Sequence, residues 1–257
     1  MKAIILSAGQ GRRLLPLTAD TPKCALPVQG QSLIEWQIDA LRRAGVNHVQ
    51  VVLGFGADKV ERLLARRFRA PQVRTLYNPF FTMTDNLVSC WVARAEMTED
   101  FLLLNGDTLF EPGVLQCLLS APLHPVTLVS DHKPSYDADD MKVTLDGNRL
   151  VNIGKALPPE QTDGESIGML SFRGEGPALF SAALEHAIRR PEALKQWYLS
   201  VIHEMAQSGL VATVSINGLQ WTEVDSPADL DQAGELVAGW TATQKLAVGA
   251  GPVLESE

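Results

Sequence analysis

The sequence predicts an α/β protein in which helices cover both faces of a mixed, mainly parallel sheet. The first observation is that short apolar runs alternate with helical patterns up to about residue 110, as they do in a parallel sheet crossed by helices. The second is a change of rhythm after residue 111, where strand-like segments and a hairpin signal follow one another. The third is the return of helical segments toward the end of the chain.

The first half of the chain begins with a predicted strand over 2–6, the apolar run KAIIL. A helix is predicted over 32–45, because Ser32 and Glu35 have the spacing of a capping box and Gly45 stands where the helix should end. The remaining predicted elements of this half alternate: strands over 48–54, 73–78 and 101–107, and helices over 57–68 and 84–97.

The second half is predicted to begin with strands. The stretch 141–155 contains the turn signal DGN, which divides it into a hairpin. A last helix is expected after Ser226, since Ser226, Pro227 and Asp229 supply an N-cap, a first-turn proline and a capping-box acid. The other predicted elements are strands over 126–131, 166–172 and 211–217 and helices over about 175–190 and 194–208.

The composition is that of an ordinary globular protein, with 257 residues of which 46% are hydrophobic and 20% charged. The formal net charge of −8 argues against a nucleic-acid partner, because surfaces that bind nucleic acid carry a basic excess. Cys24, Cys90 and Cys117 show neither metal nor disulfide spacing. No apolar run approaches the roughly 18 residues of a membrane span, so we expect a cytoplasmic protein without a membrane partner.

One segment near the start, LSAGQGRRLLPLTADTPKCALPV over 6–28, has the composition of a phosphate-binding loop. Gly9 and Gly11 allow backbone N–H groups to approach a ligand closely, and two arginines and Lys23 add positive charge. The segment is not a P-loop, because no Lys-Ser or Lys-Thr follows the glycines. It is not a dinucleotide-binding fingerprint either, since Leu14 stands at the third glycine position.

Over its whole length the segment resembles the signature of nucleotidyltransferases that act on sugar-1-phosphates and related phosphates, L-x-A-G-x-G-x-R-L-x-P-L-T followed by P-K and P-V. The residues that match are Leu6, Ala8, Gly9, Gly11, Arg13, Leu14, Pro16, Leu17, Thr18, Pro22, Lys23, Pro27 and Val28. The resemblance implies a Rossmann-like, three-layer α/β/α nucleotidyltransferase fold with a small β-rich insertion on the acceptor side.

The same resemblance implies that Arg13 and Lys23 are catalytic and contact the nucleoside triphosphate and the incoming phosphate. The chemistry agrees, because attack of a phosphate oxygen on the α-phosphorus brings two anions together and therefore needs cations and N–H donors. The residues expected to bind the nucleotide in this part of the fold are Leu6, Ala8, Gly9, Gly11 and Gly106.

We predict a single nucleotidyltransferase domain over 1–240, with a nucleotide-binding half over 1–110 and an acceptor-binding half over 111–240. The remaining residues, 241–257, lack a clear apolar face and are predicted to form a flexible tail. The sequence leaves homo-oligomerisation open.

Two aspartates stand in contexts where the resembling family holds a metal ion. Asp107 follows a buried strand, at the edge where ligands bind in open α/β sheets, although Gly-Asp is also a common turn. Asp225 precedes a helix N-terminus, where acids are common as well. A pair of carboxylates suits a Mg²⁺ ion that bridges phosphates, so we expect Mg²⁺ as the cofactor and Asp107 and Asp225 as its ligands, with Glu223 in support.

The segment NPFFTMTDNLVSCWVA, over 78–93, favours one subgroup of the family. Typical sugar-1-phosphate enzymes carry a Gly-rich segment here, whereas this one resembles the enzymes that activate phosphocholine, inositol phosphate or phosphonates with CTP. Asn86 and Ser89 are one helical turn apart and are expected to face the base, the alternative being a polar helix start.

By the same resemblance, Lys155 is expected to meet the acceptor phosphate and Glu165 a polar head group, although both could be solvated hairpin charges. Trp197, Tyr198 and Trp221 could hold a cationic acceptor against their faces, or be core and interface aromatics.

We therefore expect a Mg²⁺-dependent cytidylyltransferase that transfers CMP from CTP to a small alcohol phosphate or phosphonate, such as a phosphocholine-like acceptor, and releases pyrophosphate. Two alternatives stay open: a sugar-1-phosphate nucleotidyltransferase that uses UTP, dTTP or GTP, and a non-catalytic nucleotide-binding module.

Overall fold

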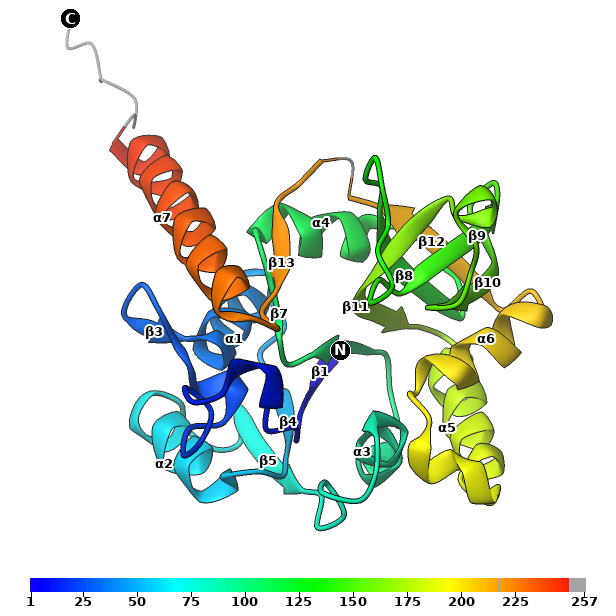
Figure 1. Ribbon diagram of the computed structural model, residues 1–257, viewed down its shortest axis with the longest axis horizontal. Helices are drawn as coiled ribbons and strands as arrows, with labels where there is room; N and C mark the ends of the chain where they lie inside the picture. Colours follow the sequence, from blue (N-terminus) through cyan, green and yellow to red (C-terminus); the bar gives the residue numbers. More distant parts are fainter. Residues whose placement is uncertain (217, 250–257) are drawn as a thin grey trace, which may run out of the picture.

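Strands and helices alternate along the first half of the chain as the sequence predicts, and the second half adds a β-rich part (Figure 1). The computed structural model describes residues 1–216 and 218–249. The strands are β1 (Lys2–Ser7), β2 (Pro27–Val28), β3 (Gln31–Ser32), β4 (Val49–Leu53), β5 (Val73–Tyr77), β6 (Phe101–Asn105), β7 (Thr108–Phe110), β8 (Val126–Asp131), β9 (Lys142–Asp146), β10 (Arg149–Gly154), β11 (Gly164–Phe172), β12 (Val211–Ser215) and β13 (Trp221–Glu223). The helices are α1 (Leu33–Arg43), α2 (Ala57–Arg67), α3 (Asn86–Val92), α4 (Pro112–Ser120), α5 (Gly176–Ala187), α6 (Leu199–Gln207) and α7 (Pro227–Gly249).

The central sheet has nine strands in the order β5-β4-β1-β6-β11-β8-β12-β10-β9. Its first four strands are parallel, with Ile4 of β1 opposite Gln50 of β4 and Leu103 of β6. Strand β11 runs antiparallel to both β6 and β8, whereas β8 and β12 are again parallel. The predicted mixed, mainly parallel sheet is confirmed.

The β-rich part lies at one end of this sheet. Strands β9 and β10 form the hairpin that DGN predicts, since Asp146 pairs with Arg149 and Gly147 takes a φ of +62° in the left-handed region. Because β9 pairs with β11 as well as with β10, the five strands β11, β8, β12, β10 and β9 close on themselves. This closed group corresponds to the β-rich insertion expected from the sequence.

Strand β1 is buried on both faces, because its side chains alternate between two apolar clusters. Ile4 and Leu6 belong to the cluster that includes residues of α3, α5 and α6. Ala3 and Ile5 belong to the cluster that includes residues of α1, α2 and α4. Helices therefore cover both faces of the sheet, which gives the three layers that the sequence predicts.

A third, smaller cluster ties the end of the chain to its beginning. Strand β13 pairs antiparallel with β7, so that Glu223 lies opposite Thr108. Helix α7 follows directly, and its Ala233 and Val237 share an apolar cluster with Leu14 of the opening segment. The last part of the chain thus returns to the first half, and the two predicted halves share this small core.

Helix α6 begins later than predicted, at Leu199. The carbonyl groups of Leu194 and Gln196 accept hydrogen bonds from the N–H groups of Asp85 and Leu87, at 2.9 and 3.3 Å. These bonds satisfy backbone donors at the start of α3. They also hold Leu194 and Gln196 outside α6.

Helix α7 extends outward from the rest of the molecule (Figure 1) and continues past residue 240 into the predicted tail. The stretch after 240 is rich in helix-favouring Ala, Leu, Gln and Lys, and no proline occurs before Pro252, so a helix forms there without a clear apolar face. The rest of the predicted tail, 250–257, and Asn217 of the predicted strand 211–217 lie outside the described residues. Neither α7 nor any other described helix has a stretch long and apolar enough to cross a membrane.

Ser32→Ala is expected to lower the free energy of unfolding by about 1 kcal/mol, because it removes the N-cap of α1. Ser32 Oγ accepts a hydrogen bond from the N–H group of Glu35 at 3.4 Å, and the Glu35 carboxylate accepts one from the N–H group of Ser32 at 2.9 Å. Urea unfolding measures the change. Ser120→Ala, at the exposed end of α4, is the control, and an equal loss in both variants would contradict the capping role.

Candidate active site

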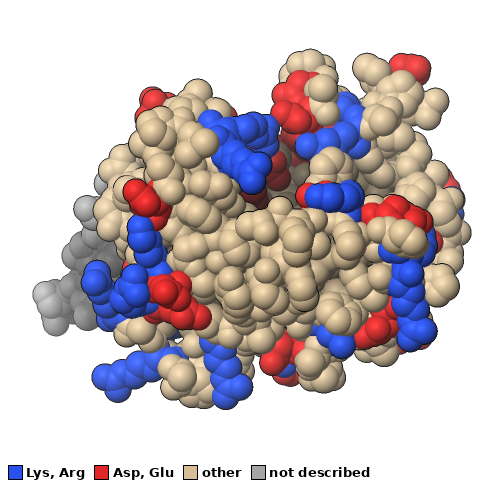
Figure 2. Space-filling view, turned by 60° about the horizontal axis from the view of Figure 1, so that its bottom comes forward, with Lys and Arg blue, Asp and Glu red and all other residues tan. Residues whose placement is uncertain are grey.

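An open cavity lies at the carboxyl ends of the parallel strands β1, β6 and β8, the edge where ligands bind in open α/β sheets. Figure 2 shows a hollow in which acidic side chains lie between Lys and Arg side chains. We call its larger part the acidic compartment, after its carboxylates Asp107, Asp131, Asp137, Asp139, Asp140, Glu165, Glu223, Asp225 and Asp229. The residues predicted from the sequence that line this compartment are Arg13, Asn86, Asp107, Lys155, Glu165, Trp197, Trp221 and Asp225.

A smaller cavity adjoins the first, and we call it the loop compartment because the Gly-rich segment forms one wall. The sequence-predicted residues that line it are Leu6, Ala8, Gly9, Asn86, Ser89, Asp107 and Trp197. Four residues line both compartments, namely Asn86, Asn105, Asp107 and Trp197. The site therefore consists of two neighbouring compartments with these four residues at their boundary.

The ammonium group of Lys23 lies between two carboxylates. Its Nζ donates to Asp107 Oδ2 at 2.8 Å and to Asp225 Oδ1, and Arg13 Nη2 contacts the other oxygen of Asp225 at 2.7 Å. Burial by itself would lower the pKa of Lys23, but the two carboxylates outweigh burial and raise it. Burial would likewise raise the pKa of Asp225, yet Lys23 and then Arg13 lower it. Lys23 and Asp225 are therefore both charged at neutral pH.

Two glycines of the opening segment have different surroundings. Gly11 has a φ of +76°, and a Cβ on it would lie 2.9 Å from the Cβ and Cδ atoms of Lys23. Gly9 lines the loop compartment, and no described atom lies within 4 Å of where its Cβ would be. The absence of a side chain at Gly11 therefore lets the aliphatic part of Lys23 pack against the opening segment. Gly9 leaves its backbone open to a ligand.

Gly106 is placed behind the site. It lines neither compartment, its N–H group donates to the carbonyl of Leu6 at 2.9 Å, and a Cβ on it would overlap the side chain of Ser7. The glycine thus lets the turn before Asp107 pack against β1, which is a structural contact and not the direct nucleotide contact expected from the sequence.

The two aspartates meet because β7 and β13 pair. The N–H group of Val224 donates to the carbonyl of Asp107 at 3.0 Å, which holds the start of Asp225 beside the turn after β6. Glu223 belongs to the same group, and burial, followed by repulsion from Asp107 and Asp225, raises its pKa to about 8. Three carboxyl groups thus gather around Lys23, and Glu223 mostly keeps its proton at neutral pH because burial and the two aspartates disfavour a further negative charge.

This donor set suits a divalent metal ion. Asp107 Oδ1 is buried and accepts no hydrogen bond from any described residue. Within the described part of the chain, no group of three or more His, Cys, Asp or Glu side chains is arranged to hold a metal ion. Mg²⁺ typically keeps water and phosphate oxygens among its ligands and needs only one or two carboxylates, which Asp107 and Asp225 can supply.

Asp139 joins two cations that reach the acidic compartment from different elements. Its carboxylate contacts Arg13 Nη1 at 2.9 Å and Lys155 Nζ at 3.5 Å. Lys155 Nζ also lies 4.8 Å from the ring centre of Trp197. Arg13 and Lys155 can therefore hold one anionic group between them. The sequence pattern did not single out Asp139, because nothing local distinguishes it from Asp137 and Asp140 of the same loop.

Glu165, on β11, is paired with Lys133, whose Nζ lies 3.1 Å from Glu165 Oε1 and 2.7 Å from Asp140 Oδ2. Burial raises the pKa of Glu165 to about 7, although Lys133 acts in the opposite direction. Lys133 lines the acidic compartment but belongs to no motif, so the sequence pattern did not reveal it.

Asn86 and Ser89 both line the loop compartment and are held by neighbouring groups. Ser89 is 4% exposed, and its Oγ accepts a hydrogen bond from Asn78 Nδ2 at 3.0 Å. Asn86 Oδ1 accepts one from the N–H group of Tyr198 at 2.9 Å. Both side chains are thus fixed in orientation before any nucleotide arrives.

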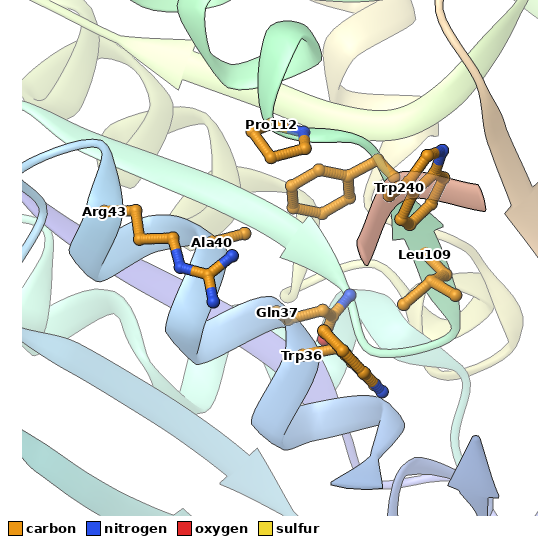
Figure 3. A pocket seen from close by; sticks show the side chains of 8 residues that line it. Trp36, Gln37, Ala40, Arg43, Leu109, Pro112 and Trp240 are labelled. Atoms are coloured by element: carbon orange, nitrogen blue, oxygen red, sulfur yellow. The ribbon is translucent and has the colours of Figure 1, made fainter. Parts of the chain in front are cut away.

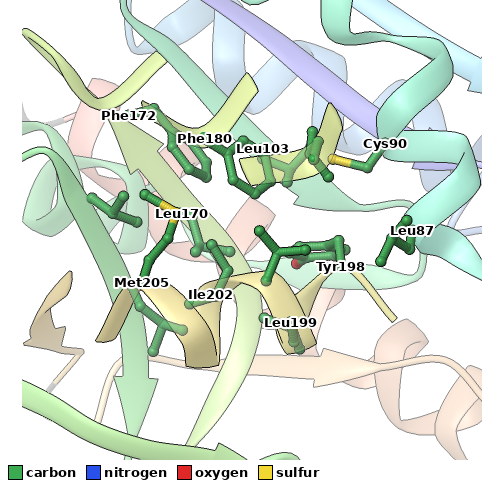
Figure 4. Close-up of a cluster of buried hydrophobic side chains, with 14 of the residues drawn as sticks. Leu87, Cys90, Leu103, Leu170, Phe172, Phe180, Tyr198, Leu199, Ile202 and Met205 are labelled. Carbon is green, nitrogen blue, oxygen red and sulfur yellow. The ribbon is translucent and has the colours of Figure 1, made fainter. Parts of the chain in front are cut away.

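The expectation that Tyr198 contacts the acceptor is wrong in this structure. The side chain is fully buried in the apolar cluster with Leu87 and Ile202 and lines neither compartment (Figure 4). Its ring fills the space between α3 and α6, and its hydroxyl donates to Asn105 Oδ1 at 3.2 Å. An aromatic pattern in the sequence does not distinguish a ring that faces a cavity from one that faces the core.

Trp197 and Trp221 do line the acidic compartment, but each is engaged by the protein. Trp221 Nε1 donates to Asp131 Oδ2 at 2.7 Å, and the Trp197 ring lies against Lys155. With Tyr198 in the core, the three predicted aromatics do not form a cage for a cation.

The turn that carries Asp107 is held by Gln37 of α1, a residue without a sequence motif. Gln37 is 1% exposed, and its Nε2 donates to the carbonyl groups of Asn105 and Thr108, both at 2.7 Å. Figure 3 shows Gln37 on α1 near Leu109, in a separate pocket between α1, β7 and α7. A glutamine within an amphipathic helix gives no signal in the sequence that it supports the site.

A Gly-rich segment whose lysine and arginine face two aspartates, at the carboxyl edge of a mixed sheet, defines the site of a nucleotidyltransferase. Comparison with known proteins agrees. Residues 3–193 match the family described as "MobA-like NTP transferase domain", and the chain belongs to this family. Its relatives are nucleotidyltransferases, and so is this protein.

Several relatives use cytidine nucleotides by name. The chain is 25% identical over 256 residues to a CTP:phosphoglutamine cytidylyltransferase of Campylobacter jejuni, covering 90% of this chain and 98% of that protein. It is 29% identical over 244 residues to a CMP-5'-(3-aminopropyl)phosphonate synthase of Streptomyces rubellomurinus, covering 91% of this chain but only 38% of that protein. The fold matches the inositol-1-phosphate CTP transferase of T. maritima with a TM-score of 0.79 and 24% identity, over 93% of this chain and 96% of the other.

Glu165→Gln is expected to change how stability depends on pH. The pKa of Glu165 is about 7 in the folded protein and near 4.5 ordinarily, so the folded state binds the proton more tightly than the unfolded state. As pH rises from 4.5 to 7, the ionisation of Glu165 therefore lowers the free energy of unfolding. The gain in free energy of unfolding of the variant over the wild type should therefore be larger at pH 8 than at pH 5. Denaturant unfolding at both pH values measures it, with the exposed Glu160→Gln as control. A difference independent of pH would contradict the raised pKa.

Proposed function

We propose that this protein is a Mg²⁺-dependent cytidylyltransferase that transfers CMP from CTP to a small alcohol phosphate or phosphonate and releases pyrophosphate. The observation that carries the proposal is that Lys23 and Arg13 pair with Asp107 and Asp225 at the boundary of two compartments. Two neighbouring compartments suit a reaction between two substrates. The relatives named for CTP, phosphoglutamine and aminopropylphosphonate support this donor and this class of acceptor.

In this proposal the loop compartment holds the nucleotide. The open backbone at Gly9 would offer N–H groups to phosphate oxygens, and Asn86 and Ser89, which line the same compartment, would contact the base. The fixed orientation of both polar side chains suits recognition of one base, because no ordering of these groups is needed on binding.

The acidic compartment then holds the acceptor. The carboxylate of Asp139 between Arg13 and Lys155 marks a place where an anionic group is stabilised from two sides. We infer that the acceptor phosphate takes this place and displaces Asp139, which belongs to an exposed loop and can move aside.

The reaction needs no covalent enzyme intermediate, because the attacking oxygen and the leaving pyrophosphate both belong to substrates. Lys23 is a fixed, buried cation, so it stabilises charge on the reacting phosphates without reorganising during the reaction. Arg13 presents a planar pair of donors to a phosphate. Asp107 and Asp225 would hold a Mg²⁺ ion, which would supply Lewis-acid charge to offset the repulsion between the two reacting phosphates.

Pyrophosphate release should depend on CTP, an acceptor and Mg²⁺. We expect turnover with CTP and at least one of phosphocholine, inositol 1-phosphate and aminoethylphosphonate, and loss of turnover in excess EDTA. The other three nucleoside triphosphates and glucose 1-phosphate complete the panel. Exclusive use of UTP, dTTP or GTP with glucose 1-phosphate would replace this proposal with a sugar-1-phosphate nucleotidyltransferase.

Lys23→Ala should lower kcat by about 100-fold to 1,000-fold, as expected when a fixed charge that stabilises the transition state is removed. Circular dichroism checks that the variant is folded, since the loss of Lys23 removes the cation paired with Asp107 and leaves Asp225 with Arg13 alone. Lys59→Ala is the control, because Lys59 contacts the carbonyl of Asp20 outside both compartments. A folded variant with near-normal kcat would refute the role given to Lys23.

A further inference from the structure

Asn105 stands where the two compartments meet. It is the last residue of β6, it lines both compartments, and Asp107 follows two residues later on the same turn. Its backbone carbonyl accepts a hydrogen bond from Gln37 at 2.7 Å, so the main chain is fixed at this point. A polar side chain on this boundary is within reach of ligands in either compartment.

The side-chain amide of Asn105 has a defined orientation. Its Oδ1 accepts the hydrogen bond from the Tyr198 hydroxyl at 3.2 Å. Because Tyr198 is fully buried, its hydroxyl needs a partner within the protein, and Oδ1 provides it. The Nδ2 group is then turned to the opposite side, toward Gly168 of β11, which lines the acidic compartment.

Gly168 leaves room for this amide. It has a φ of +71°, in the left-handed region, and a Cβ on it would overlap Nδ2 of Asn105. Within the part of the chain that the structure describes, no hydrogen bond from Nδ2 to another residue is formed. The amide is therefore a donor that is held in place by Tyr198 and Gly168 and is not used by the protein itself.

A neutral donor has an advantage at this position. The nearby cations Lys23, Arg13 and Lys155 are all paired with aspartates. An amide carries no net charge, so the surrounding carboxylates do not neutralise it, and it can still donate to a phosphate oxygen when one arrives.

We propose that Asn105 binds substrate through Nδ2, which donates to a phosphoryl oxygen where the acceptor phosphate meets the nucleotide, and that Tyr198 is the positioning residue that turns Nδ2 toward this place. The proposal rests on the proposed function, since it requires that the two compartments hold the two reacting phosphates. It gives the buried Tyr198, which touches no substrate, a part in the reaction through Asn105.

The test uses steady-state kinetics with whichever nucleotide and acceptor give the highest pyrophosphate release in the wild type. Asn105→Asp keeps the shape and still accepts from Tyr198, but it replaces the donor with an anion, so kcat/KM for the acceptor should fall at least ~100-fold. Tyr198→Phe should lower it by about 10-fold, the effect of one misplaced hydrogen bond. Ser171→Ala removes another buried hydroxyl, away from both compartments, and should leave kcat/KM unchanged.

A double-variant cycle separates positioning from stability. If Tyr198 acts only through Asn105, Tyr198→Phe should cause no further loss of kcat/KM in an Asn105→Ala background. Losses that multiply, or a Tyr198→Phe variant with a lower melting temperature but wild-type kcat/KM, would overturn the positioning role. Wild-type kcat/KM in Asn105→Asp would overturn the substrate contact.

The proposed function and this inference can fail separately. If the wild type turns over only a sugar phosphate with UTP, dTTP or GTP, the proposed function is wrong. The Asn105 and Tyr198 variants assayed with that pair then still support or overturn the substrate contact and the positioning role.

Discussion

The buried ion pairs of Lys23 are the interaction on which the site depends. Its ammonium group joins Asp107, on the turn after β6, to Asp225, which arrives from the far end of the chain. A buried charge without its partner is strongly destabilising. The opening segment, the turn after β6 and β13 must therefore all be in position for the pairs to form. Gly11 leaves room for the side chain of Lys23, and the pairing of β7 with β13 brings Asp225 beside Asp107.

The charges of the two compartments show why a nucleotidyltransferase site is strongly acidic yet able to bind phosphates. Carboxylates outnumber cations in the acidic compartment, and Arg13, Lys133 and Lys155 are each paired with at least one of them. The pairs keep the cations in place when no substrate is bound, and the excess negative charge favours a divalent cation. In the proposed function, phosphates enter by exchanging with carboxylates such as Asp139, so that each cation keeps an anionic partner throughout.

Local signals in the sequence were sufficient for the elements and for part of the site. Three such signals each involve residues that are close together in the chain: the capping box at Ser32, the hairpin turn at Gly147 and the loop with Lys23. The structure contains each of them. The contacts of Gln37 and Asn105 could not be predicted, because each side chain forms hydrogen bonds with residues far away in the sequence. No periodicity or motif records which distant group a polar side chain will meet.

By itself, the sequence determined the alternation of strands and helices, the Gly-rich opening segment with Lys23 and the two candidate aspartates, because these follow from apolar periodicity and from a motif with fixed spacing. Only the tertiary structure decided that Lys23 bridges both aspartates, that Asp139 stands between Arg13 and Lys155, and that the ring of Tyr198 lies in the core. The reason is that burial and long-range pairing arise from packing between layers, which brings together residues that the linear chain keeps apart.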